Sequence, residues 1–153
     1  MDDALRILVT TDGSPLSRSA VEVAAPLAEK LRAAVVLLRV VPPLRGNPQP
    51  ARGDLLPLVD LEERQADEAL QEMEAAFSDR SVSRVVLVSD NPAEAIISWL
   101  RQNPVDFVVM ATHGRGGLRH LLAGSVTEAV LRSGVAPVLA VRPTTVPAGA
   151  PGK

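Results

Sequence analysis

The sequence predicts an α/β protein in which helices cover both faces of an open parallel sheet. Short apolar runs rich in β-branched residues alternate along the chain with segments of helical periodicity, which is the pattern of strands joined by crossover helices. The apolar runs are nearly continuous, as is typical of strands buried on both faces. The 153 residues include no cysteine, and a chain of this length buries enough surface to fold as one domain without disulfides.

Two strands and one helix account for the first forty residues. The runs LRILVT at residues 5–10 and AVVLLRVV at residues 34–41 predict buried strands. Between them, Ser14 and Pro15 stand where a helix cap and a first helical residue belong. Apolar residues then recur every three to four positions, so we expect an amphipathic helix over residues 15–31.

The middle of the chain predicts a long loop, a second helix and a third strand. Prolines exclude regular structure between Pro42 and Pro57, and this stretch is either a lid over a ligand or an inert connection. A helical pattern follows at residues 58–77, and the run SRVVLVS at residues 83–89 predicts a strand. The sequence NPAE, which begins at Asn91, matches the start of a third helix with a capping box.

The last third of the chain predicts two more strands and a fourth helix. The strands are expected at residues 105–111 and 136–142, and the helix at residues 125–133. We expect residues 1–142 to form the domain. The proline- and glycine-rich residues 143–153 predict a disordered tail.

The composition argues against several classes of protein. The net charge is −2, aromatic residues make up 2% of the chain, and tyrosine is absent, so a nucleic-acid-binding surface is not expected. The sequence shows no apolar run near the roughly 18 residues of a membrane span, and its start does not match a signal peptide. We therefore expect a cytoplasmic protein that binds neither membranes nor nucleic acid.

A glycine-rich segment follows the strand at residues 105–111, at the end of the sheet where ligands bind in open α/β folds. Its last glycine, Gly124, precedes Ser125, and a helix that begins there presents free N–H groups and a positive dipole end to an anion. Arg115 would add positive charge. The segment lacks the lysine of a Walker A loop and has Arg119 where the dinucleotide fingerprint requires glycine. A tight connection capped by Ser125 explains the same residues, so both interpretations stay open.

Three separated blocks of the sequence resemble the universal stress protein family. They are ILVTTDGS near the start, LLRVV after the first helix, and VVMATHGRGGLRHLLAGSVTEAVL leading into APVLAVR. The ATP-binding branch of this family carries the pattern G-x2-G-x9-G-[ST]. Gly114, Gly124 and Ser125 match its last three fixed positions, and Ala111 replaces the first glycine. The resemblance implies a Rossmann-like adenine nucleotide-binding fold with four helices, whose five strands, numbered along the chain, have the order 3-2-1-4-5.

The resemblance also implies which residues hold ATP. Adenine and ribose would lie against the ends of the first, second and fourth strands, and the phosphates against the glycine segment and the last helix. The first group comprises Thr10, Thr11, Asp12, Val40, Met110 and Ala111. The second group comprises Gly114, Arg115, Gly124, Ser125, Val126 and Thr127. Mg²⁺ would arrive with ATP, and Asp12 is the carboxylate expected to hold it.

Two of these positions have a second interpretation. Asp12 precedes Gly13, and Asp-Gly forms turns without any ligand, so a purely structural role stays open. The methyl group of Ala111 either leaves nucleotide binding intact or crowds the nucleotide.

As a function, the resemblance implies a stress-response protein in which ATP is a regulatory ligand. Hydrolysis is expected to be slow at most, because a Walker lysine and a placed general base are missing. The resemblance further implies a homodimer that pairs the last strands, between Pro137 and Val141. Two alternatives stay open: a nucleotide-free dimeric interaction module, and an α/β enzyme that acts on an adenylate.

Overall fold

The computed structural model describes residues 4–43, 56–112 and 125–143. Strands and helices alternate along the chain as the sequence predicts. The strands are β1 (Arg6–Thr10), β2 (Ala34–Val41), β3 (Val82–Val88), β4 (Phe107–Ala111) and β5 (Val138–Val141). The helices are α1 (Arg18–Leu31), α2 (Leu56–Glu74), α3 (Pro92–Gln102) and α4 (Ser125–Ser133), with a 3-10 turn η1 (Ala75–Phe77) after α2.

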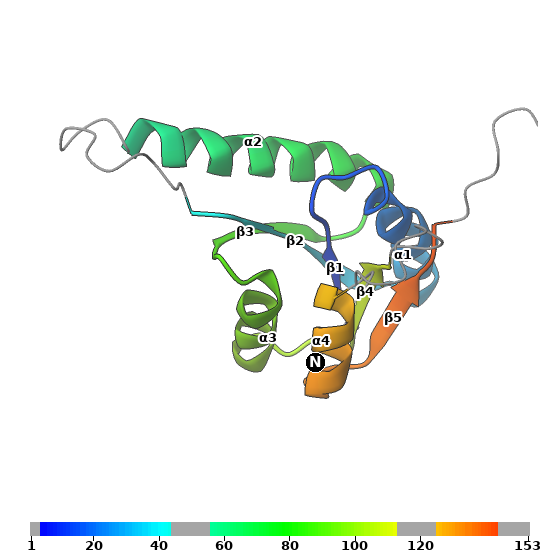
Figure 1. Ribbon diagram of the computed structural model, residues 1–153. Coiled ribbons are helices and arrows are strands. Elements are labelled where there is room, and N and C mark those ends of the chain that lie inside the picture. Colours follow the sequence, from blue (N-terminus) through cyan, green and yellow to red (C-terminus); the bar gives the residue numbers. More distant parts are fainter. Residues whose placement is uncertain (1–3, 44–55, 113–124, 144–153) are drawn as a thin grey trace, which may run out of the picture.

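The five strands form one parallel sheet in the order β3-β2-β1-β4-β5, which confirms the expected topology. The helices α1 and α2 cover one face of the sheet, and α3 and α4 cover the other (Figure 1). The strand order reverses beside β1, because the chain continues from β1 to β2 on one side and reaches β4 on the other. In open α/β sheets, the crevice beyond the carboxyl ends of the strands at this point is the usual ligand site.

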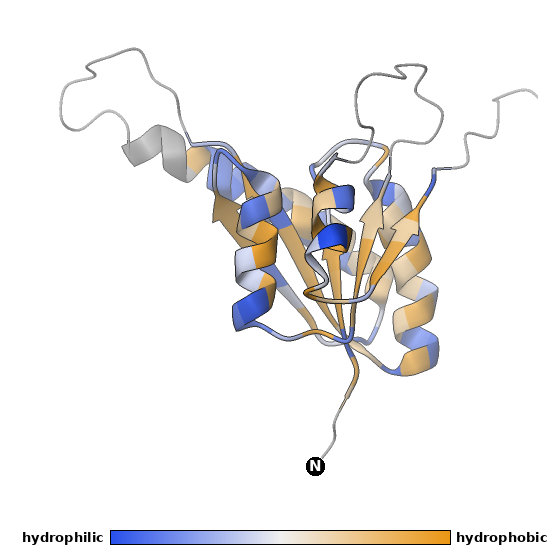
Figure 2. Ribbon diagram, turned by 60° about the horizontal axis from the view of Figure 1, so that its bottom comes forward, coloured by the Kyte–Doolittle hydropathy of each residue, from blue (hydrophilic) through white to orange (hydrophobic). Residues whose placement is uncertain are grey.

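The two faces of the sheet bury separate apolar clusters. On β1, Ile7 and Val9 pack toward α1, whereas Leu8 packs toward α3 and α4. This alternation follows from the period of two along a strand. The strands are hydrophobic along most of their length, and the helices turn their polar sides outward (Figure 2). In the described part of the chain, no helix is both long and apolar enough to cross a membrane.

Two element boundaries differ from the sequence prediction. The helix α1 begins at Arg18, so the expectation that Ser14 caps it directly is wrong by one turn. The Ser14 hydroxyl instead accepts a hydrogen bond from the Ser17 N–H at 3.3 Å, which closes a turn before the helix. The helix α2 begins at Leu56 and includes Pro57 in its first turn, where the missing N–H of proline has no intrahelical partner to lose.

Several predicted features lie outside the described residues. They are most of the proline-rich loop (44–55), the glycine-rich segment (113–124) and nearly all of the expected tail (144–153).

Candidate functional site

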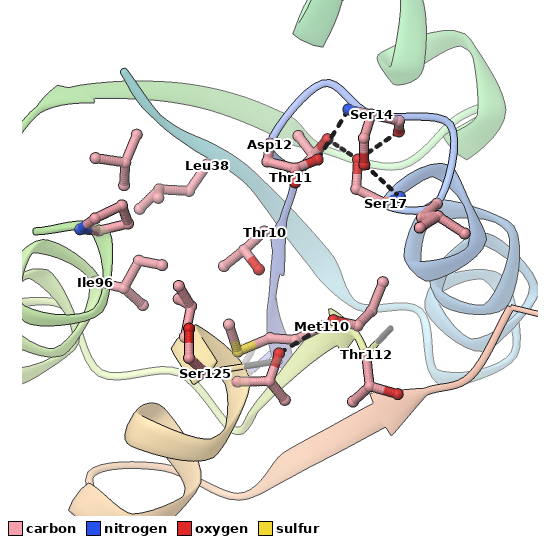
Figure 3. A pocket seen from close by; sticks show the side chains of 16 residues that line it. Thr10, Thr11, Asp12, Ser14, Ser17, Leu38, Ile96, Met110, Thr112 and Ser125 are labelled. Carbon is pink, nitrogen blue, oxygen red and sulfur yellow. Dashed lines mark hydrogen bonds between the residues drawn. The ribbon is translucent and has the colours of Figure 1, made fainter. Parts of the chain in front are cut away.

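A pocket of about 290 Å³ opens at the carboxyl ends of β1, β2 and β4, on the face that α3 and α4 cover (Figure 3). It therefore lies at the point where the strand order reverses. The residues that line it are Thr10, Thr11, Asp12, Ser14, Leu16, Ser17, Leu38, Val40, Pro92, Ile96, Met110, Ala111, Thr112, Ser125, Val126 and Thr127.

The described part of the chain brings together every site residue predicted there. The pocket residues that were predicted are Thr10, Thr11, Asp12, Val40, Met110, Ala111, Ser125, Val126 and Thr127. Gly114, Arg115 and Gly124 lie outside the described residues. Nucleotide binding by these nine residues stays a prediction.

The sequence reasoning missed the remaining lining residues. Leu38 could have been predicted as a pocket residue, because side chains two positions apart on a strand share a face and Val40 was already expected at the site. Pro92 and Ile96 could not have been predicted there, because they reach the pocket only through the packing of α3 against the sheet. Ser17 was missed because the helix was expected to begin at Pro15, whereas α1 begins at Arg18 and leaves Ser17 in the preceding turn.

The pocket lining divides into three parts of different chemistry. Leu38, Val40, Pro92 and Ile96 make one wall apolar. The loop that follows β1 contributes hydroxyls and a carboxylate to the opposite wall (Figure 3). The N-terminus of α4, at Ser125, forms the third part next to the end of β4.

A chain of hydrogen bonds holds the loop that follows β1. The hydroxyl oxygens of Thr11 and Ser17 lie 2.7 Å apart. The Ser17 hydroxyl donates to the Ser14 carbonyl oxygen at 2.8 Å, so the Thr11 hydroxyl is the donor to Ser17. The Thr11 oxygen in turn accepts from the Gly13 N–H at 3.1 Å. Because each hydroxyl both donates and accepts inside the protein, this network shapes the loop and leaves neither hydrogen for a ligand.

Asp12 is held in place by the same loop. The Ser14 N–H donates to Asp12 Oδ1 at 2.8 Å, so the turn expected from Asp-Gly does form. Partial burial acts to raise the pKa of Asp12, but hydrogen bonds, chiefly from Ser14, outweigh it and lower the pKa below its ordinary value. Asp12 is therefore an ionised, exposed carboxylate with one oxygen used in the turn, and the turn does not prevent it from meeting a ligand.

The backbone around Gly13 requires glycine. Its φ is +83°, in the left-handed region, and a Cβ there would lie 2.9 Å from the guanidinium carbon and both terminal nitrogens of Arg39. The Arg39 guanidinium thus lies close to Gly13, in the loop that carries Asp12.

The start of α4 is tied to the end of β4. The buried Thr127 hydroxyl donates to the Ala111 carbonyl oxygen at 3.1 Å. Because this hydrogen is used inside the protein, the Thr127 hydroxyl anchors the start of α4 and does not donate to a phosphate group. Glu128, in the first turn of α4, forms an ion pair with Arg132 at 2.6 Å. The positive charge of Arg132 offsets the negative charge of Glu128 near the pocket.

Position 111 does not depend on glycine for its conformation. In the described ranges, the non-glycine residues with positive φ are Arg32 and Ser78, and Ala111 is the last residue of a regular strand. Ala111 packs with the apolar cluster on the α1 face, whereas its neighbour Met110 packs with the cluster on the pocket face. The extra methyl group therefore belongs to the core contacts on the far side of the sheet.

Comparison with known proteins places the whole fold in one group. A family model described as the universal stress protein family matches residues 4–142. A universal stress protein of Methanocaldococcus jannaschii is 30% identical over 138 residues, which is 90% of this chain and 81% of that protein. One of Mycobacterium tuberculosis is 36% identical over 146 residues and covers 89% of this chain, but this chain spans only 45% of its length.

Solved structures show the same fold. A universal stress protein from Lactobacillus plantarum superposes with a TM-score of 0.74 at 24% identity, covering 90% of this chain and 97% of that chain. A universal stress protein in complex with cAMP superposes with a TM-score of 0.62 at 24% identity, covering 91% and 97%.

Proposed function

The chain belongs to the universal stress protein family, and on this premise we propose that it binds an adenine nucleotide, ATP with Mg²⁺, in the pocket beside β1. The nucleotide would act as a regulatory ligand in a stress response, and the cytoplasmic location expected from the sequence stays a prediction. One observation carries this proposal: the three parts of the pocket lining differ in chemistry as the base, the ribose and the phosphates of a nucleotide do.

Each part of the pocket suits one part of the ligand. The apolar wall around Leu38 and Ile96 suits the faces of a purine base. The ionised carboxylate of Asp12 suits the ribose hydroxyls, and its second oxygen would be available to Mg²⁺. The first N–H groups of α4, which have no partner within the helix, suit a phosphate. The cAMP complex of a relative with the same fold supports an adenine nucleotide as the ligand.

The described lining offers little for rapid hydrolysis. Among the described residues of the pocket there is no lysine, arginine or histidine, and Asp12 is the one carboxylate. Phosphoryl transfer relies on cations that neutralise developing charge and on a group that orients water. We therefore propose that the nucleotide is retained and at most slowly hydrolysed.

The test is direct. Protein purified without added nucleotide is heat-denatured, and the supernatant is analysed for released adenine nucleotide; calorimetry then measures the binding of ATP, ADP and AMP. We expect bound or titratable nucleotide in the parent and none in the variant Gly124→Val, whose added side chain would block the close approach of phosphate. Absence of both released nucleotide and binding heat in the parent would overturn the proposal.

A nucleotide-free dimeric interaction module is the second candidate, and the sheet has an edge strand that suits the dimer expected for both candidates. The strand β5 is an edge strand, and Leu139 on it is 39% exposed. The other edge strand, β3, carries Arg84, which pairs with Asp67 and Glu74 on α2. Charged side chains discourage edge-to-edge pairing, so β5 is the edge better suited to a second copy of the chain.

One variant tests the dimer, and a second variant separates the candidates. Leu139→Lys should convert a dimer to a monomer in sedimentation experiments while ATP still binds. Ala111→Gly restores the family glycine and should change the affinity for ATP by less than about twofold, because the methyl group packs away from the pocket. A large gain of ATP affinity in Ala111→Gly would instead favour the nucleotide-free module for the parent chain.

A further inference from the structure

Two adjacent threonines at the end of β1 have opposite hydrogen-bonding states. Thr10 is 8% exposed and Thr11 is 6% exposed, and both line the pocket. The Thr11 hydroxyl is used twice inside the loop, toward Ser17 and Gly13. The Thr10 hydroxyl has no hydrogen-bond partner among the described residues, although its side chain is more than nine-tenths buried.

The Thr10 hydroxyl nevertheless reaches the pocket. In the described part of the chain, no side-chain nitrogen or oxygen is both fully buried and without a partner. The oxygen of Thr10 therefore has access to the pocket space, and Figure 3 shows its side chain on the pocket floor between Leu38, Ile96 and Met110. A hydroxyl in this position can donate one hydrogen bond to whatever fills the pocket.

The position of Thr10 indicates which part of the ligand its side chain would contact. Thr10 pairs with Leu38 on β2, which belongs to the apolar wall, and Asp12 follows two residues later at the opposite wall. Thr10 thus lies between the apolar wall, which suits the base, and the loop that carries Asp12, which suits the ribose.

We propose that Thr10 contributes to binding by donating a hydrogen bond from its hydroxyl to an acceptor on the nucleoside part of the ligand, whereas Thr11 only shapes the loop. This proposal rests on the proposed nucleotide function. It predicts that the Thr10 hydroxyl contributes to binding and contributes little to the stability of the unliganded protein, since none of the described residues forms a hydrogen bond with it.

The experiment compares Thr10→Val with Thr10→Ser. Valine matches threonine in shape and lacks the hydroxyl, and serine retains the hydroxyl. We expect Thr10→Val to weaken ATP, AMP and adenosine alike by about 5- to 10-fold, with adenosine measured by competition against ATP. Thr10→Ser should bind within about twofold of the parent. The melting temperature of unliganded Thr10→Val should be unchanged or higher by up to about 3 °C, because an unpaired hydroxyl is replaced by a methyl group.

Thr11→Val is the matched control. It breaks the bonds to Ser17 and Gly13, so it should lower the melting temperature by about 3 to 8 °C. Equal ATP affinity in Thr10→Val and the parent would overturn the proposal, and so would a loss confined to the phosphorylated ligands or a lower melting temperature without a loss of affinity. A parent protein that binds no nucleotide would contradict the proposed function instead, so the two failures are distinguishable.

Discussion

The two ends of the sheet use similar polar groups in different ways. At the amino end, the Asp106 carboxylate accepts from the Arg6 N–H at 2.7 Å, and the Asp106 N–H donates back to the Arg6 carbonyl oxygen at 2.9 Å. The Arg6 guanidinium lies over the ring of Trp99, 5.9 Å from its centroid. At the carboxyl end, the Asp12 carboxylate keeps one oxygen outside the loop bonds, and the Thr10 hydroxyl has no hydrogen-bond partner among the described residues.

The difference indicates where stability and binding reside. Polar groups that pair with one another stabilise the native state, whereas polar groups held without a partner add little until a ligand arrives. Amino-end substitutions should therefore change only the free energy of unfolding. Substitutions at the carboxyl end should change affinity as well. Trp99, the single tryptophan of the chain, lies at the amino end and can report unfolding by its fluorescence.

The aspartates give the largest expected effect. Asp12→Ala should weaken ATP binding by about 10- to 100-fold, because charge-assisted hydrogen bonds to the ribose are lost. Asp106→Ala is the matched control, because the Asp106 carboxylate also accepts a hydrogen bond from a backbone N–H. This variant should lower the free energy of unfolding by about 1–2 kcal/mol without changing the affinity for ATP. Calorimetry and urea unfolding measure the two quantities. Equal losses of affinity in both variants would contradict the division between the two ends.

Two glycines with positive φ extend the comparison. Gly13 (φ +83°) lies at the carboxyl end, and Gly134 (φ +64°) lies at the amino end, between α4 and β5. Alanine at either position should lower the free energy of unfolding by about 1–2 kcal/mol through backbone strain. A Cβ at Gly134 meets no atom within 4 Å, whereas one at Gly13 must displace Arg39. We therefore expect only Gly13→Ala to weaken ATP binding as well, by about 10-fold in calorimetry. Similar affinities in the two variants would show that Arg39 does not support the loop.

The fold was largely predictable from sequence, and the reasons are physical. Continuous apolar runs and three-to-four spacing are local signals, so the element types follow from them. The strand order 3-2-1-4-5 does not follow from local signals, because strand pairing is a long-range contact. The order was expected from the resemblance to the family. The residues of the candidate site came mainly from the same resemblance, as with Asp12, for which the Asp-Gly pair alone predicted a turn. Roles set by tertiary contacts were not predictable, and the hydrogen bond from Thr127 to Ala111 is the clearest case.

That hydrogen bond provides the next test. Thr127→Val removes the tie between α4 and β4, and it should lower the free energy of unfolding by about 1 kcal/mol. Because the tie fixes the helix start beside the pocket, the affinity for ATP should also fall, by about threefold, and Thr127→Ser should restore both quantities. Asn103→Ala is the amino-end counterpart. It removes a side-chain bond to the Trp99 carbonyl oxygen at 2.9 Å and should affect stability alone. An unchanged affinity in Thr127→Val would show that the helix start is held by other contacts.

The smallest expected effect is the pH dependence that Asp12 contributes. Its pKa in the folded protein lies below the ordinary value of 3.8, so folding favours the ionised carboxylate. The resulting stabilisation is complete well above pH 3.8 and is lost as the pH falls through the folded-state pKa. Since Asp12 is exposed, we expect a contribution below about 1 kcal/mol. Urea unfolding of the parent and of Asp12→Asn between pH 6 and pH 3 isolates it, because the other carboxylates titrate in both proteins. The stability difference between the two should shrink toward acid pH, and a difference that grows would mean that the loop favours the protonated acid.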